Sequence, residues 1–502
     1  MPEDAKRKPI SRRTFVLAAS SLAAAGAAAW LTRDQISSVF TKAASYNQLV
    51  IPPVIDGTTF DLTLAESSRQ FFVGAKTPTF GYNGETFWGP TLRWKKGDTV
   101  SLKVTNKLSE TTTAHWHGIH LPAEADGGPH QPIQAGETWS PPSFQVKNEA
   151  ATYWYHPHMH ETTQRQLTMG GGGFIIIEDD SEASKSLPRE YGVDDIPLVL
   201  TSRRFDTSNA FDVSKDTAYG DYLLTNGVLN AETSVPAQLV RFRILNAETE
   251  RFFNIGLEND KKFYVVATDG GLLNKPVEVS RLRVVPGERY EIVVDLSDAT
   301  VGSTLDLKAY NEGMPFGAGG SETATTGNFG SLLNNTTFTL LHLKVAAASA
   351  SGIKALPATL AAFDWLTKAD AIKSRKVAIT DNGPGTPFTF DGNSYDMMTI
   401  NQTVELGTTE AWTITNDYVF GHAFHIHDVQ FSIISRSTGE VSDQERGWKD
   451  TFGILPNETV TFVAKFDDYA NSEHPYMYHC HMSNHEDGGL MGQFLVVDPA
   501  SA

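Results

Sequence analysis

The 502-residue sequence contains one cysteine, Cys480, and lacks a hydrophobic run suited to an ordinary membrane span. A single cysteine cannot form an intramolecular disulfide, so this thiol needs another use if it has one. The alanine-rich stretch from Val16 to Leu31 is too short and too weakly apolar to cross a bilayer. The sequence therefore predicts a mature chain without a membrane span or a disulfide framework.

Positive charge is also scarce: the chain has 41 Lys and Arg residues but 59 Asp and Glu residues, which gives a formal net charge of -18. Nucleic acids and anionic membrane surfaces require a basic face, so neither is an expected partner. A generally acidic, solvated surface explains the charge without selecting any substrate. We expect a monomeric protein that acts on small molecules.

The N-terminal segment has the features of an export signal. Lys6, Arg7 and Lys8 precede "SRRTFVL" (11–17), which carries the arginine pair, and the modest apolar stretch follows. This order is typical of a twin-arginine signal, which moves folded proteins across a membrane. We assign residues 1–45 to a signal peptide, cleaved near Ala29, and an N-terminal linker. The mature protein is expected to be periplasmic or secreted.

Helical patterning is rare in the rest of the chain. Alternating runs such as "TLRWKKGDTVSLKVTN" (91–106) and "ETVTFVAKFDD" (458–468) lie between Gly, Pro and Asn clusters and predict strands. The best helical candidate is "LPATLAAFDWLTKADAI" (356–372). The glycine-rich stretch 311–331 is expected to be a long loop.

Two short motifs recur three times in the same order. "VTN" (104–106), "ILN" (244–246) and "ITN" (414–416) each close an alternating run, and "IQAGET" (133–138), "VVPGER" (284–289) and "ILPNET" (454–459) each open another. Such internal repetition predicts an all-β chain of three tandem β-sandwich domains. We place these domains at 46–182, 190–346 and 373–502, with a linker at 347–372.

Eleven of the 15 histidines fall in four clusters, each containing His-x-His. The clusters are "HWHG" (115–118), "YHPHMH" (155–160), "HAFHIH" (422–427) and "HCHMSNHEDGGLMGQF" (479–494). Residues two apart on a strand project from the same face, so each pair would aim two imidazoles at one place. Four such pairs predict a metal centre rather than ordinary surface histidines.

The cysteine narrows the choice of metal. Imidazoles suit Zn, Cu, Fe and Ni, whereas His422, Cys480 and His485 together would form the His₂Cys set of a blue-copper electron-transfer site. Structural zinc is the rival, but it normally takes four ligands in compact, Cys-rich spacing. Zinc would also leave eight further histidines without a role.

These four motifs together resemble the three-domain bacterial multicopper oxidases of the laccase, cuprous oxidase and bilirubin oxidase group. The resemblance covers essentially the whole mature chain and implies cupredoxin-like Greek-key domains and four copper ions: one type 1, one type 2 and two type 3. Motif by motif, the implied ligands are His422, Cys480 and His485 for type 1; His115 and His425 for type 2; and His117, His156, His158, His427, His479 and His481 for the type 3 pair.

In this resemblance the first and third domains supply the trinuclear cluster, and the middle domain, with only His342, serves as a spacer. Cys480 lies between two type 3 ligands and would carry electrons from the type 1 copper to the cluster. Asp126 and Glu486 match family positions credited with proton delivery. Two structural alternatives remain open, because Asp126 also begins a turn-like D-G-G and Glu486 could simply orient a ligand histidine.

The resemblance also concerns the weak axial position of the type 1 site. In methionine-ligated relatives the axial Met lies five residues after the second type 1 histidine, which here is Leu490, with Met491 one step later. Neighbouring strand residues point to opposite faces, so only one of them can cap the copper. Spacing favours Leu490.

The implied activity is a laccase-like oxidation of phenols, aromatic amines or similar small donors, coupled to the reduction of O₂ to water. The alternatives are cuprous ion oxidation and a bilirubin oxidase-like activity. Relatives that oxidise Cu(I) often carry a methionine-rich segment, and "DMM" (396–398) is the only Met doublet here. Exported relatives that have lost their copper ligands serve cell division, which leaves a copper-free scaffold as an alternative of a different class.

Overall fold

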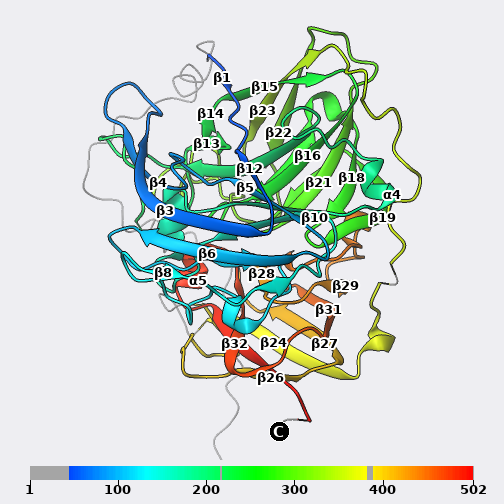
Figure 1. Ribbon diagram of the computed structural model, residues 1–502. Helices are drawn as coiled ribbons and strands as arrows, with labels where there is room; N and C mark the ends of the chain where they lie inside the picture. Colours follow the sequence, from blue (N-terminus) through cyan, green and yellow to red (C-terminus); the bar gives the residue numbers. More distant parts are fainter. Residues whose placement is uncertain (1–44, 215–217, 364, 382–387, 501–502) are drawn as a thin grey trace, which may run out of the picture. The chain divides into compact units, whose positions relative to one another are not determined.

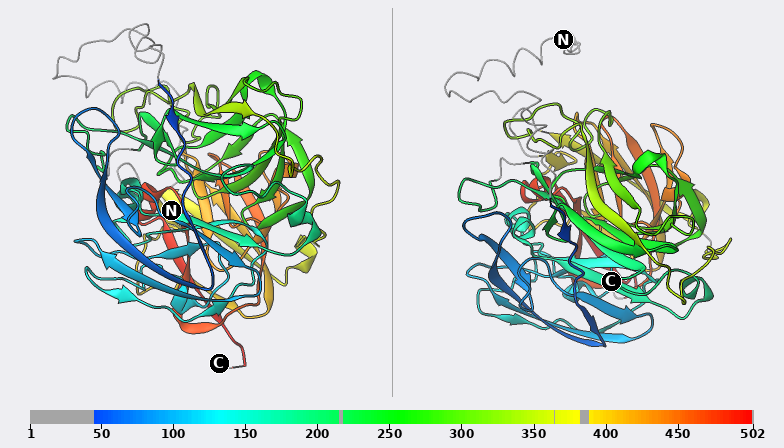
Figure 2. Two further views of the ribbon diagram at one scale, coloured as in Figure 1. Left: turned by 45° about the horizontal axis from the view of Figure 1, so that its top comes forward. Right: turned by 90° about the horizontal axis from the view of Figure 1, so that it is seen from above.

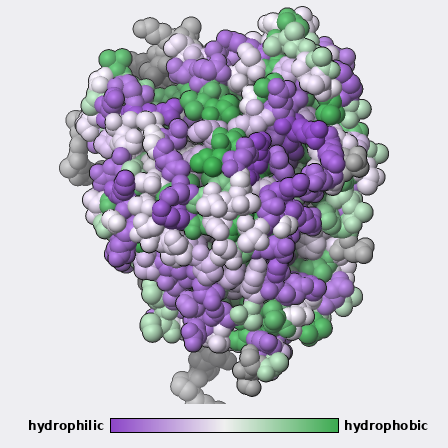
Figure 3. Space-filling view, viewed as in Figure 1, coloured by the Kyte–Doolittle hydropathy of each residue, from purple (hydrophilic) through white to green (hydrophobic). Residues whose placement is uncertain are grey.

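The computed structural model describes residues 45–500, apart from 215–217, 364 and 382–387. The predicted signal segment, except for Ser45, lies outside the described residues. Strands dominate, and the blue-to-cyan, green and yellow-to-red strands form three groups in Figures 1 and 2. The face in Figure 3 intersperses hydrophilic and hydrophobic residues. Among the described residues, no helix combines the length and apolar character that crossing a bilayer requires.

The first group of strands forms two sheets. One has the order β4 (Thr77–Tyr82), β3 (Thr59–Arg69), β6 (Thr99–Lys107), β8 (Thr138–Trp139), with β9 (Phe144–Gln145) also on β6. The other has the order β2 (Val54–Asp56), β5 (Thr91–Lys95), β11 (Gly173–Glu178), β10 (Ala151–His156), β7 (His115–His117). Strand β6 shows why the sequence adopts this fold: Val100, Leu102 and Val104 alternate into the core while their neighbours are less buried.

The middle group also forms two sheets. One contains β1 (Asn47–Gln48), β15 (Ala231–Pro236), β23 (Thr337–Ala346), β22 (Thr304–Tyr310), β17 (Phe253–Leu257) and β20 (Leu282–Val284). The other contains β14 (Val228–Leu229), β13 (Tyr222–Thr225), β12 (Asp195–Arg203), β16 (Leu239–Asn246), β21 (Arg289–Asp295), β18 (Phe263–Thr268) and β19 (Gly271–Val279). No strand is assigned within 311–331, in agreement with the predicted long loop.

The last group repeats the arrangement. One sheet contains β25 (Phe388–Phe390), β24 (Lys373–Asp381), β27 (Thr408–Asn416), β31 (Thr459–Phe466) and β29 (Phe431–Arg436). The other contains β26 (Gln402–Glu405), β33 (Met491–Val497), β32 (Asn471–Cys480), β28 (His422–Ile426) and β30 (Thr451–Ile454). The all-β fold of tandem sandwich-like units is as predicted, whereas the exact domain bounds stay a prediction.

Helices are few and short in the described residues. They are α3 (Thr163–Met169), α4 (Glu182–Lys185) and α5 (Ser483–Asp487), with 3₁₀ turns at Ala123–Ala125, Glu258–Asp260, Lys368–Asp370 and Asp443–Glu445. The predicted helix at 356–372 is wrong: its described residues contain only the Lys368–Asp370 turn. Leu360 is instead buried against Leu239 and Val266, so its apolar residues cover the middle group without forming a helix.

The recurring motifs contact each other in the same way in all three groups. The asparagine that ends the first motif is fully buried each time, and its Nδ2 donates to two carbonyls, one a few residues further on and one in the second motif. The contacts are Asn106 to Glu110 and Ile133, Asn246 to Arg251 and Val284, and Asn416 to Phe420 and Leu455. The sequence repeat is therefore a repeated structural device that ties a strand end to the start of another.

Candidate metal centre

Two strand pairs position most of the predicted histidine ligands. In the first group β7 and β10 are antiparallel neighbours, with His115 directly opposite His156. In the last group β28 and β32 are neighbours, with His425 opposite His479. Each register places imidazoles from two strands side by side, although the strands are far apart in sequence.

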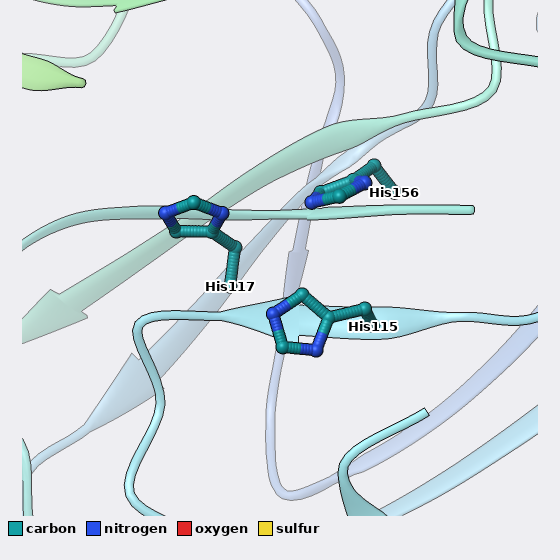
Figure 4. A group of neighbouring side chains, drawn as sticks. All are labelled: His115, His117 and His156. Carbon is teal, nitrogen blue, oxygen red and sulfur yellow. The ribbon is translucent and has the colours of Figure 1, made fainter. Parts of the chain in front are cut away.

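The expectation that every His-x-His pair lies on one strand holds only for His115 and His117. In the other three pairs the first histidine belongs to a strand and the second, His158, His427 or His481, follows the strand end. The rings within the four pairs are nevertheless 5.0–6.0 Å apart between centroids. Figure 4 shows His115, His117 and His156 gathered in this way.

Eight histidines of the two groups form one buried cluster. The Nε2 atoms of His158, His427 and His479 lie 3.1–3.3 Å from one another. Rings from different groups stack in two places: His117 on His425 at 3.8 Å between centroids, and His115 on His427 at 3.9 Å. All eight side chains are buried. Ring stacking alone does not explain why the nitrogen atoms of these rings lie so close together.

The hydrogen bonds of these rings leave nitrogen lone pairs aimed at one another. In six of the eight rings the outer nitrogen bonds to a carbonyl or carboxylate oxygen, as His156 Nδ1 does to Pro157 O at 2.8 Å. Inner nitrogens, among them His115 Nε2, His117 Nδ1, His156 Nε2 and His425 Nε2, are buried without a hydrogen-bond partner. Fixing one nitrogen of an imidazole as a donor and freeing the other is the arrangement that a metal ligand requires. The residues present therefore fit metal ions.

Burial also keeps these imidazoles in the state that binds a metal. It lowers the pKa of His117, His156, His425, His427 and His481 well below the usual value, and the neighbouring histidines lower it further. A neutral imidazole retains a lone pair for a metal, whereas an imidazolium does not.

A second set of three predicted ligands lies beside the eight-histidine cluster. His422 on β28, Cys480 at the end of β32 and His485 on α5 form a triangle: the two Nδ1 atoms are 3.1 Å apart, and each is 3.6 Å from Cys480 Sγ. Burial lowers the pKa of His485 to about 3 and raises the pKa of the Cys480 thiol to about 12. A bound cation would reverse the preference of the thiol, because a coordinating thiol is deprotonated.

Leu490 directly precedes β33 and Met491 begins it, so their side chains point to opposite faces of the β32–β33 pair. Leu490 O accepts a hydrogen bond from Cys480 N at 3.1 Å, and its side chain belongs to the apolar cluster that contains Cys480. Met491 faces His479 in the β32–β33 register. Cross-strand partners share a face, so the Met491 side chain is directed away from that of Cys480. This geometry places the Leu490 side chain, and not that of Met491, on the face of Cys480.

The two predicted acids lie against the eight-histidine cluster. Asp126 Oδ2 accepts from His427 Nδ1 at 2.7 Å, and its backbone carbonyl accepts from His115 Nδ1 at 2.8 Å. Gly127, with φ of 77°, packs so tightly on Ala114 O that a Cβ would lie 1.8 Å from it, so the D-G-G turn itself brings Asp126 here. Glu486 on α5 places its two carboxylate oxygens 3.0 Å from His158 Nδ1 and 3.3 Å from His479 Nδ1.

Sequence reasoning missed three residues that also contact the cluster. Asp450 Oδ1 is 3.1 Å from His117 Nε2, and Thr451 Oγ1 lies 3.2–3.3 Å from nitrogens of His117 and His425. Gly287 of the middle group packs against the ring of His481, since a Cβ there would lie 2.7 Å from it. Asp450 and Thr451 belong to no metal-ligand pattern in the sequence, so only the fold reveals their contacts with the histidines.

Comparison with known proteins decides which family has this arrangement. Family models described as multicopper oxidase match residues 64–182, 152–303 and 369–500. The chain belongs to the multicopper oxidase family. Membership supports copper binding and an oxidoreductase activity, since these enzymes use O₂ and a reductant.

Three relatives illustrate the range of the similarity. The multicopper oxidase mco of Staphylococcus haemolyticus is 31% identical over 468 residues, which cover 90% of this chain and 93% of the relative. The cell division protein FtsP of Yersinia pestis is 32% identical over 496 residues, or 97% of this chain and 98% of that protein. The structure of the bacterial laccase-like multicopper oxidase CueO from Ochrobactrum sp. superposes with a TM-score of 0.79 at 33% identity, covering 89% of this chain and 100% of that one.

Proposed function

We propose that this multicopper oxidase is laccase-like and couples the one-electron oxidation of phenols or similar small donors to the four-electron reduction of O₂ to water. The observation that carries the proposal is the pair of buried ligand sets. His422, Cys480 and His485 would hold a type 1 copper, and the eight-histidine cluster would hold a type 2 copper and a type 3 pair.

Bound copper supplies the redox chemistry, and the chain supplies position and connection. Cys480 joins the two ligand sets covalently, because its side chain faces His422 and His485 while its chain neighbours are His479 and His481 of the cluster. The assignment within the cluster follows the ligand pairs: His115 and His425 for type 2, and the other six for type 3. Asp126 and Glu486, each against ring nitrogens of the cluster, would pass protons to it.

Aromatic rings beside the type 1 ligands favour an aromatic donor. The Phe388 ring is 4.3 Å from the His485 ring and 5.0 Å from the His422 ring, and Tyr418 packs on Phe388 at 4.9 Å. Phe420 continues the series at 5.6 Å from Tyr418 and stacks on the half-exposed Phe329. Flat aromatic molecules gain from contact with such rings, so this flank suits a phenol better than a bare metal ion.

The test compares O₂ uptake with a phenol, with Cu(I) and with bilirubin under the same conditions. We expect the phenol to give the highest kcat/KM, and Phe388→Leu to reduce that value without changing the rate with Cu(I). Cys480→Ser, which removes the link between the ligand sets, should abolish uptake with all three. Faster turnover of Cu(I) or bilirubin would replace the phenol as donor class and leave the oxidase intact.

The similarity to FtsP favours a second candidate of another class, an exported scaffold without copper. The complete set of ten histidines and one cysteine argues against it, because a scaffold needs none of their lone pairs. Colour separates the two: copper-loaded protein should be blue, whereas a scaffold would be colourless.

We also propose that the chain is exported by the twin-arginine route to the periplasm or the medium and acts as a monomer. The support for the export route is the order of basic residues, arginine pair and apolar stretch in residues 1–45. A copper enzyme benefits from a route that carries folded protein, since its ligand sets join segments more than 300 residues apart.

A further inference from the structure

Arg289, on β21 of the middle group, is fully buried and uses all five of its N–H donors. Its Nε donates to Thr152 O of the first group at 3.1 Å, and two further donors reach Gly287 O and Asp269 O of the middle group, each at 3.0 Å. The last two bind both carboxylate oxygens of Asp450 in the last group at 2.6 Å. One guanidinium thus joins three parts of the chain that are far apart in sequence.

Asp450 transmits this anchoring to two histidines of the cluster. Its Oδ1 accepts from His117 Nε2 at 3.1 Å, and its backbone carbonyl accepts from His425 Nδ1 at 2.9 Å. These bonds explain why the two stacked rings leave different nitrogens free, Nδ1 in His117 and Nε2 in His425. A donor bond on one imidazole nitrogen fixes the tautomer and directs the lone pair of the other.

Three further buried charged residues surround Arg289 and Asp450. Lys449 Nζ lies 2.9 Å from Asp269 and 2.8 Å from Glu288, and Arg289 is 3.7 Å from Asp269. Three carboxylates (Asp269, Glu288, Asp450) and two cations (Arg289, Lys449) therefore form one buried network. The network holds the Asp450 carboxylate in place, because moving it would break its two charge-assisted bonds to Arg289.

We propose that Arg289 and Asp450 are positioning residues for the copper cluster, so the middle group holds the cluster together rather than serving as a spacer. The inference rests on the proposed function. Asp450 supports one of the two type 2 histidines, His425, but only one of the six type 3 histidines, His117. Loss of this support should therefore release type 2 copper first.

The experiment compares copper-loaded wild type with Asp450→Asn and Arg289→Lys. Asn keeps the size of Asp450 but turns an amide N–H toward either Arg289 or His117, and Lys lacks the fork that binds both oxygens. Arg243→Lys is the matched control, because Arg243 is also a buried middle-group arginine that reaches Thr152, yet its partners are Asp195 and Glu291 rather than a carboxylate on a histidine. Each protein is dialysed against increasing chelator, and copper content, the type 2 electron paramagnetic resonance signal and the blue band are recorded.

We expect Asp450→Asn and Arg289→Lys to lose the type 2 signal at chelator concentrations about 10–100-fold lower than wild type, with the blue band retained. Arg243→Lys should keep the wild-type copper profile even if its thermal midpoint falls. If Arg289→Lys does not fold, Asp450→Asn decides. Wild-type retention in the folded variants, or equal loss in Arg243→Lys, would overturn the proposal. A wild type that takes up no copper would instead defeat the proposed function, and this inference with it.

Discussion

The proposed proton-transfer role of Asp126 can be tested separately from its structural role. Its carboxylate contacts His427 Nδ1, and its backbone carbonyl contacts His115, so an amide side chain would preserve the turn and the backbone contact. An amide cannot pass a proton. We expect Asp126→Asn to slow reoxidation of the reduced enzyme by O₂ about 100-fold, while anaerobic reduction of the blue copper stays normal.

Stopped-flow recording of the blue band follows both half-reactions. Asp194→Asn is a suitable control, because Asp194 is buried and accepts a hydrogen bond from Gln238 without touching the cluster. Reoxidation at the wild-type rate in Asp126→Asn would leave Asp126 with its structural role alone.

Leu490 carries a prediction about the potential of the type 1 site. An apolar cap would leave a bound copper with three strong ligands in a dry surrounding and would favour Cu(I), whereas a thioether would stabilise Cu(II). Leu490→Met should therefore lower the type 1 potential, and Met491→Leu, its matched control on the opposite face, should leave it nearly unchanged. Redox titration of the blue band measures both, and the reverse pattern would identify Met491 as the axial residue.

At the scale of elements, the strands that carry the histidines were the most predictable part of the site, whereas their pairing was not predicted. Alternating runs indicated the strands, and His-x-His spacing indicated where imidazoles gather. The pattern could not show that His158, His427 and His481 lie just beyond strand ends, because spacing alone does not fix where a ladder stops. The wrong helix prediction at 356–372 has a related cause. Apolar spacing that suits a helix also suits a non-helical segment that covers a hydrophobic surface, as the segment around Leu360 does.

His120 and Asp468 connect the segment after β7 to the segment after β31, and this contact predicts a pH dependence. Burial alone would lower the pKa of His120, but its hydrogen bond to Asp468 and the charge of that carboxylate raise it. Burial would raise the pKa of Asp468, but His120 and Lys147 hold it below its usual range. The His120 contribution to stability is complete below the unfolded value and disappears as pH rises through the raised folded pKa. The Asp468 contribution disappears as pH falls through the lowered folded pKa.

His120→Gln should therefore reduce the free energy of unfolding most between about pH 4 and pH 6.5, by on the order of 1–2 kcal/mol, and less at pH 8.5. Urea unfolding at pH 5.5 and pH 8.5 measures the difference. An equal effect of His120→Gln at both pH values would contradict the assignment.

At the scale of the whole molecule, the repeated Asn contacts explain why three units could be predicted from two short motifs. The buried Asn residues and their carbonyl partners recur because each unit closes in the same way. What joins the units was not predictable. Arg289 contacts Thr152 and Asp450, each more than 130 residues away, and such long-range pairing leaves no local pattern in the sequence.

Export is a property of the whole chain and has its own test. Replacing Arg12 and Arg13 by Lys keeps the charge but removes the arginine pair that the twin-arginine route reads. We expect the double variant to remain in the cytoplasm as a folded protein, while wild type reaches the periplasm or medium. Cell fractionation measures the distribution, and unchanged export of the variant would point to another route.

The central claim, that two buried ligand sets hold copper for O₂ reduction, is tested most directly by the metal content and spectrum of wild type matured with excess copper. The ligand sets predict about four copper ions per chain, an intense blue band from the thiolate and a type 2 paramagnetic signal. A colourless protein with stable occupancy near one ion, or with zinc throughout, would contradict the account.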